Sequence, residues 1–194
     1  PERGIFGHPA VPGVIAVGAV DAAGPGYTTV EPFSDSGPSE IKYPSAVLRA
    51  KPDVTGIDGV TTTVSGFNPF FGTSAAAPHI AGIAALLKQA SPEMTPAQVK
   101  TALTSTATDI ETAGEDSRSG AGLVNAEAAL DWIRPDVTVD KASLTMTGYE
   151  GRFGATAQRL VLTNTVKERG GQMKWSVGAD VPWLHFNRKD GRAN

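Results

Sequence analysis

Residues 72–82 read GTSAAAPHIAG, and this stretch carries the strongest structural signal in the chain. The Ala- and Leu-rich run continues to Ala90 with apolar residues at helical spacing, which predicts a buried helix with closely packed small side chains. Gly72 permits a tight turn into the helix. Pro78 suits a first helical turn, where backbone N–H groups have no partner within the helix. The stretch therefore places Ser74 at the start of a buried helix.

A serine at a helix start has two interpretations. The free N–H groups and the positive end of the helix favour an anion beside Ser74, and acyl transfer to a serine develops such an oxyanion. Alternatively, Ser74 is an ordinary N-cap whose hydroxyl accepts a backbone N–H. Local physics alone leaves both interpretations open.

Outward from this stretch, strand-like and helical patterns alternate. A continuous apolar, β-branched run at 14–20 predicts a buried strand, and 51–57 and 60–64 are weaker strand candidates. Thr95, Pro96 and Gln98 form a capping-box pattern that predicts a helix from 95 to about 107. A third helix is expected over 125–133. This mixture predicts an α/β layered domain.

The composition changes near residue 134. We expect an α/β domain over 1–133, a linker over 134–138 and a separate β-module over 139–194. Short strands separated by polar turns are typical of the first part of a β-sandwich. The strands expected in this module are 143–147, 159–163, 173–177 and 183–186.

Composition also excludes several classes of protein. The chain has 194 residues, a net charge of −3 and no basic stripe with aromatic residues, so nucleic acid is not an expected partner. Cysteine is absent, which excludes disulfides and a cysteine nucleophile. The longest apolar run, 80–87, is too short to cross a bilayer. No initiator Met opens the sequence, so we expect the chain to start inside a longer protein. We also expect truncation at the other end, because the strands expected in the β-module leave little room for closing strands before residue 194.

The stretch at 72–82 resembles the nucleophile signature of the subtilases, Gly-Thr-Ser-x-x-x-Pro-His-x-x-Gly. Similarity to the family extends over about 8–130. Besides the signature, it is carried by Pro12–Asp21, the Phe-Ser-x-x-Gly-Pro turn at 33–38, the Lys-Pro-Asp strand at 51–54 and Gly120–Ala126. These segments resemble the C-terminal half of a subtilase catalytic domain, which has three layers with packed helices around a mostly parallel sheet.

The resemblance implies a serine endopeptidase that forms an acyl-enzyme on Ser74 and cleaves protein or peptide substrates. Thr73 is expected to support the oxyanion more distantly. The family's catalytic Asp and His, and its oxyanion-hole Asn, precede the serine by a long stretch. We therefore expect the isolated chain to be inactive and to need the upstream half of its domain as a partner. Family membership also implies secretion or a cell-envelope location.

Other polar residues invite competing interpretations. His79 is expected to be structural, His8 to shape a turn beside the substrate pocket, and His185 to be a solvated strand residue. Asp35 begins an Asp-Ser-Gly that imitates aspartic proteases, but no second such motif exists.

Three acidic residues, Glu40, Asp53 and Asp58, are candidates for holding a stabilising cation. Solvated loop carboxylates are the favoured interpretation, so no metal site and no cofactor is predicted. The resemblance still allows structural calcium in the longer protein.

The β-module resembles the start of a BACON-type immunoglobulin-like domain, through Leu162-Thr163-Asn164, Trp175-Ser176 and Trp183-Leu184. Two roles for the tryptophans stay open, namely a platform for carbohydrate and the core of a sandwich, of which the core is favoured. A non-catalytic pseudoprotease or scaffold whose β-module binds a ligand is accordingly the alternative to the enzyme.

Overall fold

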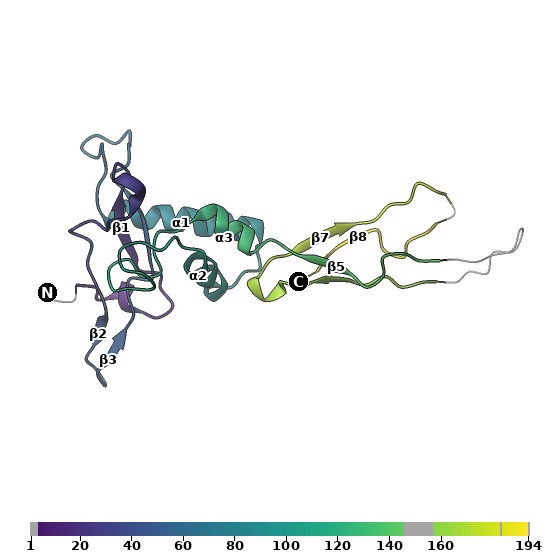
Figure 1. Cartoon of the computed structure of the whole chain (residues 1–194), viewed down its shortest axis with the longest axis horizontal. Coiled ribbons are helices and arrows are strands. Elements are labelled where there is room, and N and C mark those ends of the chain that lie inside the picture. The colour runs from purple at the N-terminus through teal and green to yellow at the C-terminus, as the bar shows by residue number, and fades with distance from the viewer. Residues whose placement is uncertain (1–3, 146–156, 183, 194) are drawn as a thin grey trace, which may run out of the picture. The chain divides into compact units, whose positions relative to one another are not determined.

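The computed structural model describes residues 4–145, 157–182 and 184–193 (Figure 1). The chain divides into two compact units, Pro1–Ile133 and Arg134–Asn194. Each unit has its own strand pairs and is described separately below.

The first unit is built on two parallel strands, β1 (Val17–Asp21) and β4 (Val54–Asp58). Their register pairs Val17 with Val54 and ends with Asp21 opposite Asp58. The central residues of both strands are buried, as expected for a parallel pair covered by other elements. Two acidic side chains therefore end neighbouring strands at one edge of the sheet.

Helix α1 (Thr73–Ala90) packs against both strands and joins the main apolar cluster with α2 (Pro96–Ser105) and α3 (Ala126–Trp132). The buried members of this cluster are Val54, Ile80, Leu87, Met94, Val99, Ala102, Leu103, Ala129 and Ile133. The predicted helices and the mixed α/β class are thus confirmed.

The expectation of a wholly buried α1 is wrong for the described residues. Only Ala75, Ala76, Ile80 and Leu87 of this helix are buried, while Leu86 is 49% exposed. The helix packs on the strands along one stripe, and the other side faces outward. Pro78 also lies in the second turn, because the helix begins at Thr73.

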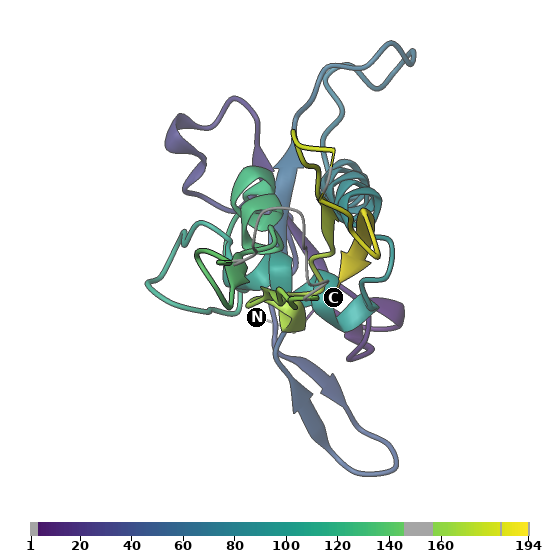
Figure 2. The same cartoon turned by 90° about the vertical axis from the view of Figure 1, so that its right-hand side faces the viewer.

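Two segments project from the strand pair in opposite directions (Figure 2). One is the antiparallel hairpin of β2 (Ser39–Ile41) and β3 (Val47–Arg49), which the sequence did not predict. The other is the loop over 59–72 between β4 and α1. The strand expected at 60–64 is wrong, since a single bridge between Val60 and Phe70 is the only pairing described there.

Two short 3₁₀ helices complete the described elements of this unit, η1 (His8–Ala10) and η2 (Pro25–Tyr27). A turn at 119–124 extends the sheet edge beside β4. Thr55 donates its N–H to the Gly122 carbonyl at 2.8 Å, and its carbonyl accepts the Val124 N–H at 3.0 Å. The Gly-Leu-Val segment of the sequence therefore serves as a neighbour of β4.

The second unit contains two separate antiparallel pairs in its described part. β5 (Val137–Val139) pairs with β6 (Leu162–Asn164), and β7 (Met173–Ser176) pairs with β8 (Asp190–Ala193). A 3₁₀ turn, η3 (Lys167–Arg169), lies between the two pairs in the chain.

Strand expectations for this unit are only partly confirmed. β7 and β6 fall within or beside predicted strands, whereas β5 starts inside the segment expected to be a linker. The described residues 143–145 and 184–186 are not strands, and 146, 147 and 183 lie outside the described residues. An immunoglobulin-like sandwich therefore stays a prediction.

Candidate active site at the start of helix α1

Ser74 is the second residue of α1 and is exposed. The N-cap of the helix is Gly72, and no side chain caps the helix there. Within the described residues the Ser74 hydroxyl makes no hydrogen bond. The interpretation of Ser74 as a structural N-cap therefore does not hold, and its hydroxyl is left open to solvent.

Gly72 sets the start of the helix. Its φ of 117° and ψ of 156° lie in a backbone region that essentially only glycine adopts. Its carbonyl accepts the N–H groups of Ala75 at 2.8 Å and Ala76 at 3.2 Å. The N–H groups of Thr73 and Ser74 therefore precede the first bond inside the helix, at its positive end, where they favour an anion.

The loop before Gly72 presents aromatic side chains. Phe67 and Phe70 meet edge to face, with ring centroids 5.0 Å apart and planes at 81°. Phe67 and Phe71 are each about half exposed, at 49% and 48%. Apolar surface therefore lies on the polypeptide that leads directly into Ser74.

The strand ends beneath this loop carry negative charge. Asp58 is fully buried, and its Oδ2 accepts the Gly72 N–H at 2.6 Å. Burial, and then the charges of Asp58 and Asp21, raise the pKa of the Glu31 carboxyl above its ordinary value. The start of α1 is thus tied by its backbone to an acidic cluster of three side chains, Asp21, Glu31 and Asp58.

No histidine of the described residues is hydrogen-bonded to Ser74. His79 is exposed, and its Nδ1 lies 2.8 Å from the Ala75 carbonyl of its own helix, which agrees with a structural role. His8 is exposed in η1. His185 is exposed too, but it lies in an irregular segment of the second unit and not in the expected strand. Asp35 is also exposed, in the turn after Phe33.

The three candidate cation ligands do not form one site. Asp53 is buried and bonded to the ammonium groups of Lys51, at 2.6 Å, and Lys100, so its oxygens are already occupied. Glu40 is exposed on β2, and Asp58 binds the Gly72 N–H. No group of three or more acidic or histidine side chains suited to a metal ion was found in the described part of the chain.

A second polar network, which the sequence did not predict, holds the turn beside β4. Asp116 accepts the N–H groups of Arg118 at 2.6 Å and Ser119 at 2.9 Å, and the Ser119 hydroxyl at 2.9 Å. Burial acts to raise the pKa of Asp116, but these bonds and the Thr112 N–H hold it below its ordinary value. The sequence did contain a signal for this turn, because Asp116 lies two and three positions before Arg118 and Ser119, the spacing at which an Asp side chain accepts backbone N–H groups in a turn.

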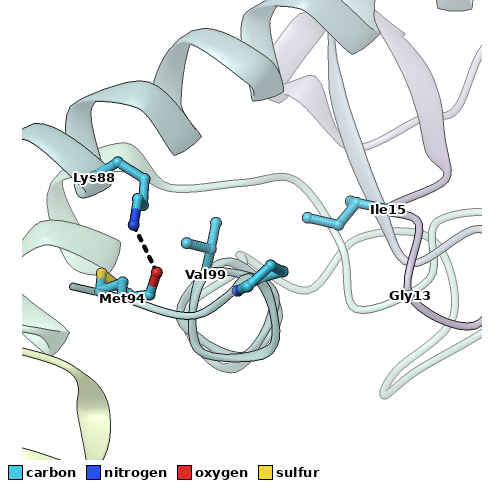
Figure 3. A pocket seen from close by; sticks show the side chains of 6 residues that line it. Gly13, Ile15, Lys88, Met94 and Val99 are labelled. Atoms are coloured by element: carbon cyan, nitrogen blue, oxygen red, sulfur yellow. Dashed lines mark hydrogen bonds between the residues drawn. The ribbon is translucent and has the colours of Figure 1, made fainter. Parts of the chain in front are cut away.

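An apolar pocket of about 230 Å³ lies at the other end of α1 (Figure 3). It is lined by Gly13, Ile15, Lys88, Met94, Pro96 and Val99. Lys88 lies 14 residues after Ser74, or about 21 Å along the helix. Its ammonium donates to the Met94 carbonyl at 2.7 Å, which closes one side of the pocket. The pocket is therefore separate from the Ser74 site.

Comparison with known proteins identifies the family. A family model described as "Subtilase family" matches residues 7–122, more than half of the 194 residues, and these include Ser74. The chain belongs to the subtilase family. No helix in the described residues is both long and apolar enough to span a membrane.

Individual subtilases show the extent of the similarity. Fervidolysin from Fervidobacterium pennivorans is 32% identical over 178 residues, covering 87% of this chain and 25% of that protein. Alkaline elastase YaB from Bacillus sp. (strain YaB) is 48% identical over 73 residues, covering 37% of this chain and 18% of that protein. The chain thus spans a quarter or less of these subtilases.

The solved structure of fervidolysin, described as a keratinolytic enzyme related to subtilisin, aligns with a TM-score of 0.46 at 32% identity. The alignment covers 64% of this chain and 20% of that one.

Proposed function

We propose that this chain supplies the nucleophile of a subtilisin-like serine endopeptidase, and that Ser74 is that nucleophile. The observation that carries the proposal is the state of Ser74 itself. It is exposed, makes no hydrogen bond among the described residues, and follows the Gly72 turn at the positive end of α1. Its place inside the family match adds independent support.

In the proposed reaction, Ser74 Oγ attacks the carbonyl carbon of a peptide bond while its proton passes to a histidine. The resemblance puts that histidine, and the aspartate that orients it, upstream of this chain in a longer protein. The tetrahedral oxyanion lies against the Ser74 N–H, with Thr73 as a more distant support. The amine leaves with the proton, and water then hydrolyses the acyl-enzyme. The isolated chain, which lacks this histidine and aspartate, should be inactive.

We propose proteins or peptides as the substrates and, by analogy with the family, secretion or a cell-envelope location. For the second unit we propose a BACON-like module in which Trp175 is structural. Arg188 lies over the Trp175 ring, 5.6 Å from its centroid, and a Cβ at Gly191 would come within 2.8 Å of that ring. These contacts cover part of the half-buried Trp175 ring, which favours a structural role over an open carbohydrate platform.

The Ser74→Ala variant of the longer protein tests the proposal. We expect it to lose nearly all hydrolysis of casein, at least a thousandfold, because the covalent step is removed. Ser65→Ala is the matched control, since Ser65 is also exposed and lies in the loop just before α1. Wild-type activity in Ser74→Ala would exclude Ser74 as the nucleophile and favour the non-catalytic scaffold.

A further inference from the structure

Asp58, the last residue of β4, is buried and only half satisfied. Its side chain has no exposed surface, and Oδ2 accepts the Gly72 N–H at 2.6 Å. Oδ1 is also buried and has no hydrogen-bond partner among the described residues. Leaving a buried acceptor unpaired is costly, so an unpaired oxygen in a folded protein calls for an explanation. The proposed catalytic sequence does not use Asp58, which leaves its role to be assigned.

The contact with Gly72 acts on the turn that introduces Ser74. Gly72 holds a backbone conformation that is strained for other residues, and its carbonyl accepts the N–H groups of Ala75 and Ala76 in α1. Its N–H has Asp58 as its partner. A hydrogen bond to a carboxylate is about twice as strong as one between neutral groups. The two backbone groups of Gly72 thus link the end of β4 to the first turn of α1.

A second contact fixes the same strand against the same helix. A Cβ built on Gly56 would lie 2.9 Å from the Ala76 carbonyl oxygen and 3.2 Å from the Ile80 side chain. Strand and helix therefore touch with no room between them, two residues before Asp58 and two residues after Ser74. With the body of α1 seated in this way, the Asp58–Gly72 bond adds a second tie between β4 and the helix, at its first turn.

We propose that Asp58 is a positioning residue for the nucleophile. Its carboxylate holds Gly72, and thereby sets the direction of the Ser74 hydroxyl and of the Ser74 N–H relative to the bound carbonyl. This inference rests on the proposed function of Ser74. It adds Asp58, which lies on β4, 14 positions upstream of Gly72, and whose effect on catalysis passes through the backbone of Gly72.

The test measures the rate and the end point of Ser74 modification by a fluorophosphonate in the longer protein. Asp58→Ala removes the acceptor, and Asp58→Asn keeps an oxygen that can accept the Gly72 N–H but not its charge. Asp21→Asn is the matched control. Asp21 lies opposite Asp58 in the strand register, and its Oδ1 accepts only the Ala23 N–H of its own turn in the described residues.

A misplacement of about 1 Å in a catalytic group costs on the order of 100-fold in rate. We expect Asp58→Ala to slow adduct formation roughly 100-fold while the final adduct per protein stays near that of the wild type. Asp58→Asn should be roughly three- to tenfold slower, and Asp21→Asn within about twofold. In peptide hydrolysis the loss should appear in kcat, with KM within about twofold, because ground-state binding is not altered.

Three results bear on the inference, and they distinguish its failure from the failure of the proposed function of Ser74. If Asp58→Ala forms the adduct at the wild-type rate, Asp58 is merely structural. The same holds if only the final amount of adduct per protein falls while the rate is unchanged. If Asp58→Ala does not fold, Asp58→Asn decides, and a rate equal to that of Asp21→Asn overturns the proposal. If the folded wild type gives no adduct, the proposed function of Ser74 has failed, and the inference fails with it, before any Asp58 variant is compared.

Discussion

Removing the Asp53 carboxylate should destabilise the strand pair beneath the candidate site more than any other single polar change. Asp53 is 8% exposed, and Lys51 is 3% exposed. The Asp53 carboxylate accepts the Lys51 ammonium at 2.6 Å, the Ala16 N–H at 2.7 Å and the Lys100 ammonium. One side chain therefore neutralises a buried cation and also ties the start of β1 to β4.

The expected magnitude follows from what Asp53→Ala leaves behind. Among the described residues, Lys51 would keep the Val14 carbonyl as its one partner, at 2.7 Å, and would have no counter-ion for its buried charge. Breaking a buried ion pair in this way costs about 3–5 kcal/mol. Lys100→Ala is the matched control, because the Lys100 side chain is 29% exposed and a partly exposed pair contributes about 0–1 kcal/mol.

Hydrogen exchange followed by mass spectrometry suits this prediction, because it reports on the peptides over 14–21 and 51–58 separately from the second unit. A loss of about 4 kcal/mol speeds exchange there roughly a thousandfold. Replacing both partners, as in Lys51→Met with Asp53→Ala, should cost less than the sum of the single changes. If the loss of stability in Asp53→Ala is within about 1 kcal/mol of the loss in Lys100→Ala, the buried-pair reasoning is wrong.

Two further predictions concern packing and charge near Ser74. Gly56→Ala should lower the free energy of unfolding by about 1–3 kcal/mol, because the new Cβ would lie 2.9 Å from the Ala76 carbonyl oxygen. An unchanged Tm would show that β4 and α1 can move apart to accept a methyl group. The pKa of Glu31 is raised from 4.5 by burial and then by nearby acids, so its contribution to stability is full below pH 4.5 and is lost as pH rises through the folded-state pKa. The stability of Glu31→Gln relative to the wild type should therefore increase as the pH rises from about 4.5 to about 7. Urea midpoints of the two proteins that differ by the same amount at about pH 4.5 and at about pH 7 would contradict this.

Local signals in the sequence predicted local structure well. The capping box at Thr95 is present as expected, with the Thr95 hydroxyl accepting the Gln98 N–H at 3.3 Å and Gln98 Oε1 accepting the Thr95 N–H at 2.8 Å. Asn125 likewise caps α3. These features depend on residues three positions apart, so the pattern of the sequence contains them. The start of α1 is a local feature of the same kind. The sequence predicted a tight turn at Gly72, and the structure adds that Gly72, not Ser74, is the N-cap.

Contacts between distant residues could not be predicted in the same way. The Asp58–Gly72 bond spans 14 positions, and Lys100 of α2 meets Asp53, the residue before β4, across 47 positions. Residue types alone made Asp53 and Asp58 equal candidates for a cation. Only the folded arrangement shows that one neutralises a buried lysine and the other holds the turn before Ser74.

The hairpin of β2 and β3 was missed for a related reason. Each strand has only three residues, Ser-Glu-Ile in β2 and Val-Leu-Arg in β3, so neither shows in its sequence the apolar–polar alternation over four or more residues that predicts a half-buried strand. In the second unit, the three-residue strands β5 and β6 pair across 23 or more positions, which short apolar runs do not specify.

The most direct measurement is the site of covalent modification by a fluorophosphonate in the folded, longer protein, located by peptide mass spectrometry. The account predicts a single adduct on Ser74, lost in Ser74→Ala and retained in Ser65→Ala. An adduct on another serine, or no adduct on a protein shown to be folded, would contradict the assignment of Ser74 as the nucleophile.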